Sequence, residues 1–296
     1  MDLQNLQAFL LVAETGSFSL AAEQLHLTQP AVSKRVALLE DALGNKLFDR
    51  IGRSTSLTEA GLALLPHAKS IEQELQAAAR SVSDLAGGVG GDLRIATSHH
   101  IGLHRLPPVL SSFSRDYPAV HLDIDFMDSE QAYELVLQGK VELAVVTLSP
   151  EEEPSVIDDP IWHDPLEVMI ARDHELFASN PRPDLDALSH LPAILPGLNT
   201  YTGQIIKQLF DKRGLELKVT LATNYLETIR MMASVGLGWT ILPRSMGDDS
   251  LTLIDLPDVV MERVLGLIYH RGRSLSRAAQ AFIATLREHG DNVANP

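Results

Sequence analysis

Three histidines close together in the sequence, His99, His100 and His104, carry side chains suited to binding chemistry. An imidazole nitrogen can bind a metal ion or donate a hydrogen bond to an anion. Because His100 and His104 are four residues apart, one face of a helix could present both to a metal ion. The sequence requires no third metal ligand, so we predict no metal site. We expect the histidines to donate to a bound ligand or to cap a helix, and the choice between these two roles stays open.

Polar residues follow several short apolar runs after residue 92. These runs alternate with helical segments, a pattern that predicts parallel α/β sheets. Ligands of open α/β sheets bind at the carboxyl ends of strands, where helix amino termini direct amide protons inward. The segments expected at those ends are residues 97–100, 128–129, 147, 197–202 and 224. Helix caps use the same residue types, so each polar residue by itself fits a cap as well as a ligand contact.

Several kinds of catalytic chemistry are excluded by what the sequence lacks. There is no cysteine, which excludes disulfides, thiolate metal sites and cysteine nucleophiles. The GxSxG, HExxH and Walker motifs are absent. The stretch GGVGG at 87–91 lacks the spacing of a phosphate loop and is expected to be a hinge. We therefore predict that the protein is not an enzyme, with no catalytic residue and no cofactor, and keep a cleft enzyme as an alternative.

The stretch LHLTQPAVSKRVALLE at 25–40 has the pattern of a DNA-recognition helix. Thr28 can cap this helix, and Pro30 falls in its first turn. The preceding helical stretch LAAEQL ends in a three-residue turn, which gives helix-turn-helix geometry for the major groove. The alternative is that this helical module makes only protein–protein contacts. The side chains expected to reach base edges or phosphates are Gln29, Ser33, Lys34 and Arg35.

A formal net charge of −15 would oppose DNA binding if it were spread evenly over the molecule. Residues 29–58 instead carry five cations against three carboxylates, and most of the surplus acid lies after residue 90. Phosphate contacts depend on charges within a Debye length of about 10 Å, so the net charge does not exclude DNA. Arg50 and Arg53 lie on a predicted hairpin that turns at Gly52, where a wing could contact the minor groove or the DNA backbone.

A long helix is predicted after Thr58, and GGVGG should end it. Its apolar residues recur by alternating steps of four and three, the a/d pattern of a coiled-coil seam. This pattern predicts a dimerisation helix, and a dimer would present two recognition helices to the DNA. The alternative is an amphipathic helix packed on its own domain. The residues of the stripe are Leu64, Ala68, Ile71, Leu75, Ala78, Val82 and Leu85.

Longer stretches resemble a known family. AETGSFSLAAEQLHLTQPAVSKRVALLEDALGNKLFDR and SLTEAG closely resemble the winged helix-turn-helix of LysR-type transcriptional regulators. RLPPVLSSFSRDYPAVHLDI, ELVLQGKVELAVV and MMASVGLGWTILP resemble their effector domain, a two-lobed α/β domain like periplasmic binding proteins. The resemblance implies an α+α/β multidomain fold. Its expected parts are a DNA-binding domain at 1–58, a linker helix and hinge at 59–91, and an effector domain at 92–296, with lobe I at about 92–163 and 267–296 and lobe II at about 164–266.

The resemblance also implies particular contacts and partners. The implied DNA contacts are Gln29, Pro30, Ser33, Lys34 and the wing residue Arg53. The implied effector contacts are His100 and Ser129 first, then Thr97, Ser98, His99, Thr147, Thr200, Tyr201, Thr202 and Asn224. The expected partners are double-stranded operator DNA, a small-molecule effector and further copies of the chain, as a homodimer or homotetramer. With no export signal or membrane span in the sequence, a cytoplasmic location is expected, which disfavours the alternative of a solute-binding protein.

Overall fold

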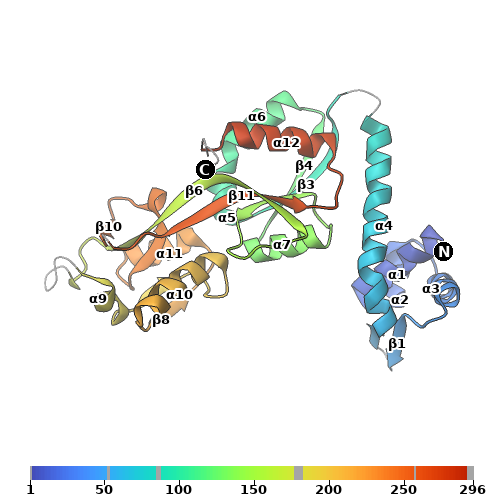
Figure 1. The fold of residues 1–296 in the computed structure, drawn as a ribbon, viewed down its shortest axis with the longest axis horizontal. Coiled ribbons are helices and arrows are strands. Elements are labelled where there is room, and N and C mark those ends of the chain that lie inside the picture. Colours follow the sequence, from blue (N-terminus) through green and yellow to red (C-terminus); the bar gives the residue numbers. More distant parts are fainter. Residues whose placement is uncertain (1, 52–53, 85–87, 177–182, 257, 292–296) are drawn as a thin grey trace. The chain divides into compact units, whose positions relative to one another are not determined.

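A computed structural model describes residues 2–51, 54–84, 88–176, 183–256 and 258–291 (Figure 1). The chain forms two compact units, Met1–Ala86 and Gly87–Pro296, and each is described by itself. Among the residues so described, no helix combines the length and the apolar character needed to cross a membrane.

The first unit begins with three helices and a hairpin. Asp2 caps the first helix through a hydrogen bond that its carboxylate accepts from the Gln4 amide at 3.1 Å, and Gly16 ends that helix at a φ of 62°. Ser17 caps the second helix in the same way as Asp2 caps the first. The elements are α1 (Leu3–Thr15), α2 (Phe18–Gln24), α3 (Gln29–Leu43), β1 (Phe48–Ile51) and β2 (Ser54–Leu57).

The turn between α2 and α3 spans residues 25–28, one residue more than the predicted three, and it has a different cap. His26 takes a φ of 54°, the left-handed conformation that lets the chain reverse within this short turn. Thr28 occupies the N-cap position of α3, yet its side chain makes no cap hydrogen bond, so the predicted Thr28 cap is wrong in that respect. Pro30 lies in the first turn, where its missing amide proton leaves no helical bond unmade.

The core of the first unit is closed by a buried carboxylate. Val32, Val36 and Leu39 on α3 pack with the apolar faces of α1 and α2. The next residue, Glu40, is 8% exposed and accepts hydrogen bonds from the Leu47 amide at 2.9 Å and from Lys46 Nζ at 2.6 Å. Burial opposes ionisation of Glu40, but these hydrogen bonds outweigh burial and hold the pKa of its carboxyl below the usual 4.5. Glu40 thus fixes the end of α3 to the start of the hairpin.

Replacing Glu40 by Gln is expected to lower the free energy of unfolding by about 1–2 kcal/mol at pH 7, because an amide is a weaker acceptor than a carboxylate. The folded-state pKa is depressed, so the carboxylate contributes fully above pH 4.5 and its contribution is lost as the pH falls through the folded pKa. Urea unfolding at pH 7 and below pH 4.5 should show a difference between wild type and variant that shrinks at the lower pH. Glu23→Gln, on the exposed surface of α2, should change stability by less than about 0.5 kcal/mol.

The long helix α4 (Glu59–Asp84) divides the predicted apolar stripe between two roles. Ala68 is fully buried in the core of the first unit, and Leu64 and Ile71 pack against the same core. Leu75 is 40% exposed, and Ala78 is also exposed. The side chains of Val82 and Leu85 lie outside the described residues. The first turns of the stripe therefore pack on their own domain, and its later part presents apolar side chains outward.

The second unit is built around a seven-stranded sheet with the order β10-β6-β11-β5-β3-β4 (Figure 1). β9 also pairs with β6, on the edge opposite β10. A separate pair, β7 and β8, completes the strands of the second lobe. The strands are β3 (Gly91–Thr97), β4 (Val120–Phe126), β5 (Leu143–Thr147), β6 (Val156–Ala171), β7 (Ala193–Leu195), β8 (Val219–Ala222), β9 (Thr240–Pro243), β10 (Leu251–Ile254) and β11 (Glu262–His270).

The sheet is mixed, whereas the sequence pattern predicted parallel sheets. β3 pairs in parallel with β4 and β5, as the strand-helix alternation predicted. β11 pairs antiparallel with both β5 and β6, and β9 and β10 pair antiparallel with β6. The difference arises because β6 and β11 are long strands that run from one lobe into the other. A strand that returns to the first lobe enters it from the opposite direction.

Two sets of buried side chains correspond to the two lobes. One surrounds Phe113, Val145 and Phe282, and the other surrounds Phe210, Ile241 and Trp239. The helices that cover the sheets are α5 (His99–His104), α6 (Leu106–Asp116), α7 (Ser129–Leu137), α9 (Leu185–Ser189), α10 (Tyr201–Arg213), α11 (Leu226–Ser234) and α12 (Arg277–Glu288), with the short 3-10 helix η1 (Arg244–Met246) after β9.

Candidate effector cleft and DNA-facing helix

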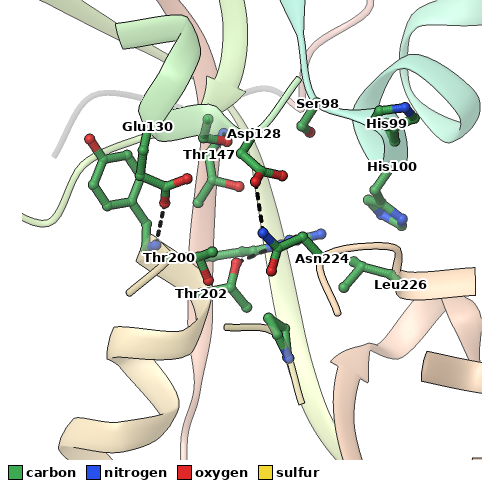
Figure 2. Close-up of a pocket in the computed structure, with 14 residues that line it drawn as sticks. Ser98, His99, His100, Asp128, Glu130, Thr147, Thr200, Thr202, Asn224 and Leu226 are labelled. Carbon is green, nitrogen blue, oxygen red and sulfur yellow. Dashed lines mark hydrogen bonds between the residues drawn. The ribbon is translucent and has the colours of Figure 1, made fainter. Parts of the chain in front are cut away.

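A pocket lies between the lobes, where the loops after the strands meet (Figure 2). It holds about 480 Å³ of space outside the atoms, counting its open mouth. Nine of the ten predicted effector residues line it, and the structure therefore brings together side chains from five separate segments. The lining residues are Ser98, His99, His100, Asp128, Ser129, Glu130, Thr147, Pro196, Thr200, Tyr201, Thr202, Asn224, Leu226 and Arg263.

Carboxylates of the first lobe hold the second lobe across this pocket. Asn224 donates through Nδ2 to Asp128 Oδ2 at 2.7 Å, and the amide of Tyr201 donates to Glu130 Oε1 at 2.5 Å (Figure 2). Asn224 Oδ1 also accepts from the Gly197 amide at 3.0 Å, which fixes the loop before α10. Both carboxylates are thus occupied by donors of the chain itself. These donors are neutral, so both carboxylates keep their negative charge and disfavour an anion bound directly beside them.

A buried arginine forms the floor of the pocket. Arg263 on β11 is 5% exposed, and its Nε donates to Asp164 Oδ2 at 2.8 Å. Its Nη1 donates to Thr202 at 3.2 Å, and Nη2 has no hydrogen-bond partner in the described part of the chain. Burial lowers the pKa of Arg263, and Asp164 opposes that shift. With Asp164 paired beside it, the guanidinium stays charged and keeps one donor group available to a ligand.

His100 is a second buried side chain of the pocket with unsatisfied polar atoms. It is 5% exposed, and neither ring nitrogen has a hydrogen-bond partner among the described residues. Burial, aided by the charge of Arg263, lowers the pKa of His100 to about 4. The imidazole is therefore neutral at pH 7. His104, one turn later on α5, does not line the pocket; its Nε2 lies 2.8 Å from Glu227 Oε1 on α11.

The threonines and serines of the pocket serve partly as structural groups. Thr200 caps α10, since its hydroxyl oxygen accepts from the Gly203 amide at 3.1 Å. Ser129 Oγ accepts from the Thr147 amide at 3.1 Å, which joins α7 to the end of β5. Ser98 makes no side-chain cap hydrogen bond, so its hydroxyl is the most available of the set. Capping groups and predicted contact residues thus lie together in one loop cluster.

Thr97 does not join the other predicted contacts. It is fully buried, and its hydroxyl donates to the Val145 carbonyl at 2.8 Å, so its predicted role as an effector contact is not supported by its position. Its side chain falls on the inner face of β3, whereas Ser98 begins the turn into the pocket. Sequence reasoning missed Pro196, Leu226 and Arg263 as lining residues and left Asp128 and Glu130 out of the contact set. The position of Arg263 near the start of a strand gave no signal of a site.

The predicted DNA-facing residues lie together at the start of α3. Gln29, Pro30 and Lys34 are exposed, and Ser33 is half-buried. Gln29 Nε2 donates to Ser33 Oγ at 2.8 Å, which positions both polar groups on one face. Arg35 donates from Nη2 to the Gln4 side chain on α1 at 2.8 Å. The wing residue Arg53 and the side chain of Arg50 lie outside the described residues.

A helix-turn-helix with a hairpin wing, joined to a two-lobed domain with an interlobe pocket, defines a ligand-responsive transcriptional regulator. Residues 3–62 match the family described as bacterial regulatory helix-turn-helix protein, lysR family, and residues 86–291 match the LysR substrate binding domain. The chain belongs to the LysR family of transcriptional regulators.

Known proteins resemble the chain along nearly its whole length. It is 35% identical over 247 residues to a probable nitrogen assimilation transcriptional activator of Synechococcus elongatus, covering 83% of this chain and 79% of the relative. A full-length OxyR variant from Pseudomonas aeruginosa has the same fold, with a TM-score of 0.73 at 22% identity over 97% of this chain and 95% of that one. Full-length CbnR in complex with its target DNA matches with a TM-score of 0.63 at 22% identity, covering 98% and 100% of the two chains.

Proposed function

We propose that this regulator binds operator DNA through the start of α3 and senses a small anionic effector in the pocket between its lobes. The single observation that carries the effector chemistry is the buried Arg263, which lines the pocket with one guanidinium nitrogen unpartnered. A buried donor without an acceptor costs free energy, and a carboxylate or other oxyanion would supply the missing acceptor. The protein would act in the cytoplasm and bind the effector without turning it over.

Binding in this pocket would change how firmly the lobes close. The contacts from Asp128 to Asn224 and from Glu130 to the Tyr201 amide both cross between lobes. An anion that engages both lobes would favour one degree of closure over another, a coupling of about 1–3 kcal/mol in typical allosteric proteins. The closure would be transmitted to the DNA-binding units through the oligomer.

The oligomer is proposed from the outer part of α4. Leu75 and Ala78 are exposed on the helix that otherwise packs on its own unit. A second copy of the helix would cover them and bring two recognition helices to one operator. We propose the same three functional parts for the chain. They are a DNA-binding domain at 1–58, a linker at 59–91 and an effector domain at 92–296.

The DNA contacts are tested by binding to the intergenic DNA beside the protein's own gene. Ser33→Ala is expected to weaken specific binding by about 10-fold, since a lost hydrogen bond to a base or phosphate costs about 1–3 kcal/mol. Lys34→Ala should weaken binding to all sequences and reduce the salt slope by about 1, because one phosphate contact is lost. Fluorescence anisotropy at several salt concentrations measures both effects.

The control for Lys34→Ala is Lys212→Ala, which removes one exposed cation from the second unit at the end of α10. It should leave the salt slope unchanged. Equal losses in the two lysine variants would mean that general charge governs binding, and the assignment of α3 to the groove would then be wrong.

The effector contact is tested with Ser98→Ala, which removes a pocket hydroxyl that makes no cap bond. A panel of small carboxylates and inorganic phosphate is first screened for an upward shift in melting temperature. Calorimetry on the best ligand should then show binding about 10-fold weaker in Ser98→Ala, since a hydrogen bond to a charged group contributes about 1.5–3 kcal/mol. Ser114→Ala, on the exposed face of α6, should bind as wild type does. Stabilisation by neutral ligands alone would contradict an anionic effector.

A further inference from the structure

Three metal-binding side chains meet where α5 of the first lobe approaches α11 of the second. His100 Nδ1 lies 3.9 Å from Glu227 Oε1, and His104 Nε2 lies 2.8 Å from the same oxygen. One ligand atom from each of the three residues lies within 4.8 Å of the others. The two histidines belong to one lobe and the glutamate to the other, so the cluster spans the lobe boundary.

His100 gives this cluster an unsatisfied buried group. Its ring is 5% exposed, and both nitrogens lack a hydrogen-bond partner in the described ranges. Buried polar atoms in folded proteins are nearly always bonded, so an imidazole with neither nitrogen satisfied calls for a ligand. His104 and Glu227 are 44% and 36% exposed, which leaves a path from solvent to the cluster.

The spacing fits a metal ion after small side-chain movements. Tetrahedral zinc binds imidazole nitrogen and carboxylate oxygen at about 2.0–2.2 Å, which separates neighbouring ligand atoms by about 3.3 Å. The observed distances of 2.8 and 3.9 Å lie on either side of that value. Rotation of the exposed Glu227 carboxylate would adjust both distances without moving the backbone.

The charges around the cluster also allow a cation. Glu227 supplies the carboxylate of the cluster, with Oε1 2.8 Å from His104 Nε2. The positive charge of Arg263 also acts on His100, and Arg263 is paired with Asp164 at 2.8 Å. Arg105 shares that aspartate at 3.1 Å, so one of the two guanidinium charges is offset and one remains. A divalent ion would therefore be held by the Glu227 carboxylate and the two imidazoles against one remaining guanidinium charge.

We propose that His100, His104 and Glu227 form a binding site for a divalent transition-metal ion of the zinc type, which links the two lobes at the edge of the effector pocket. Two imidazoles and one carboxylate leave the fourth coordination position of a tetrahedral ion open for water or a ligand oxygen. This donor set favours zinc, cobalt or nickel over magnesium and calcium, which prefer oxygen ligands throughout. The site goes beyond the proposed anion sensing and DNA binding, and its test depends on neither.

To test the site, the untagged full chain is treated with a chelator and titrated with Co²⁺. The visible absorption of the bound ion measures binding, and Zn²⁺ is then added to displace the Co²⁺. Wild type is expected to bind one ion per chain, with no competition from a large excess of Mg²⁺. His104→Ala and Glu227→Gln should each weaken binding by about 100-fold or more, since even the loss of an outer-shell partner costs 10–100-fold. Both residues are partly exposed, so these variants are expected to fold.

The matched control is His163→Ala. His163 is also a half-exposed histidine paired with a glutamate, Glu262, but no third ligand lies beside that pair among the described residues. The His163→Ala variant should bind Co²⁺ with an affinity within about twofold of wild type, because no ligand of the proposed site is changed. Zn²⁺ should raise the melting temperature of wild type and of His163→Ala, but not of the two site variants. Wild-type affinity in His104→Ala and Glu227→Gln, or an equal loss in His163→Ala, would overturn the proposal.

Discussion

Replacing Asp164 by Asn is expected to lower the free energy of unfolding of the second unit by about 3–5 kcal/mol. Asp164 is 1% exposed and lies opposite Arg263 in the pairing of β6 with β11. Its two oxygens accept from Arg263 at 2.8 Å and from Arg105 at 3.1 Å. Asparagine keeps the shape of the side chain but removes the charge, which leaves the buried guanidinium of Arg263 uncompensated. Urea unfolding followed by circular dichroism measures the loss.

An exposed arginine–aspartate pair on two neighbouring strands provides the control. Arg94 and Asp123 are directly opposite on β3 and β4, with 53% and 58% of their side chains exposed. Asp123→Asn should cost less than about 1 kcal/mol, because water screens the pair and Arg94 keeps Asp125 as a partner at 2.8 Å. The double replacement of Asp164 by Asn and Arg263 by Met should recover part of the stability, since no buried charge remains. Equal losses at positions 164 and 123 would show that burial of the Asp164 pair has no special cost.

The elements of the first unit could be predicted from local sequence because local interactions determine them. The apolar spacing of α1 and α3, the proline at the start of α3 and the glycine after α1 all act within a few residues. The cap at Thr28 could not be predicted, because whether its hydroxyl reaches an amide depends on one side-chain torsion. The same limit applies to the polar residues of the pocket, where Thr200 caps a helix and Ser98 does not.

The pairs that define the cleft could not be predicted because their partners lie far apart in the sequence. Arg263 and Asp164 are 99 residues apart, and their contact depends on the register of β11 against β6. Glu227 lies 123 residues from His104 and completes a cluster for which the histidine spacing gave only two ligands. Such contacts follow from the return of the chain into the first lobe, which periodicity along one segment does not record.

The linker helix shows how one periodic pattern can serve two surfaces. A heptad stripe predicts that one face is buried, but it does not specify whether that face packs on the chain itself or on another copy. In the structure Ala68 is buried in its own unit, whereas Leu75 is exposed seven residues later on the same stripe. The first stretch thus packs on its own unit, as one interpretation predicts, and dimerisation stays a prediction for the later stretch.

Replacing Gly203 by Ala is expected to destabilise the second unit by about 2–3 kcal/mol and to weaken effector binding, because the added methyl group has no room. A Cβ at Gly203 would lie 2.1 Å from the Gly197 carbonyl oxygen and 2.8 Å from the Leu198 Cα, both backbone atoms. That carbonyl also accepts from the Thr200 amide at 2.9 Å and the Thr200 hydroxyl at 2.7 Å. The loop would have to break these bonds to move aside. Urea unfolding and calorimetry with the effector hit measure the two losses.

Gly247→Ala separates this steric effect from the general effect of replacing a glycine in the same unit. Gly247 follows η1 at a φ of −67°, which alanine adopts readily, and its added Cβ would meet only Arg244 O at 3.4 Å and Met169 at 3.5 Å. Alanine there should be neutral or stabilising by up to about 1 kcal/mol, because it lowers the entropy of the unfolded chain. If the two variants had equal free energies of unfolding, the 197–203 loop could move aside without loss of stability, and the steric argument would be wrong. Unchanged effector affinity in Gly203→Ala would further mean that the loop positions no ligand contact, which would remove Thr200, Tyr201 and Thr202 from the proposed site.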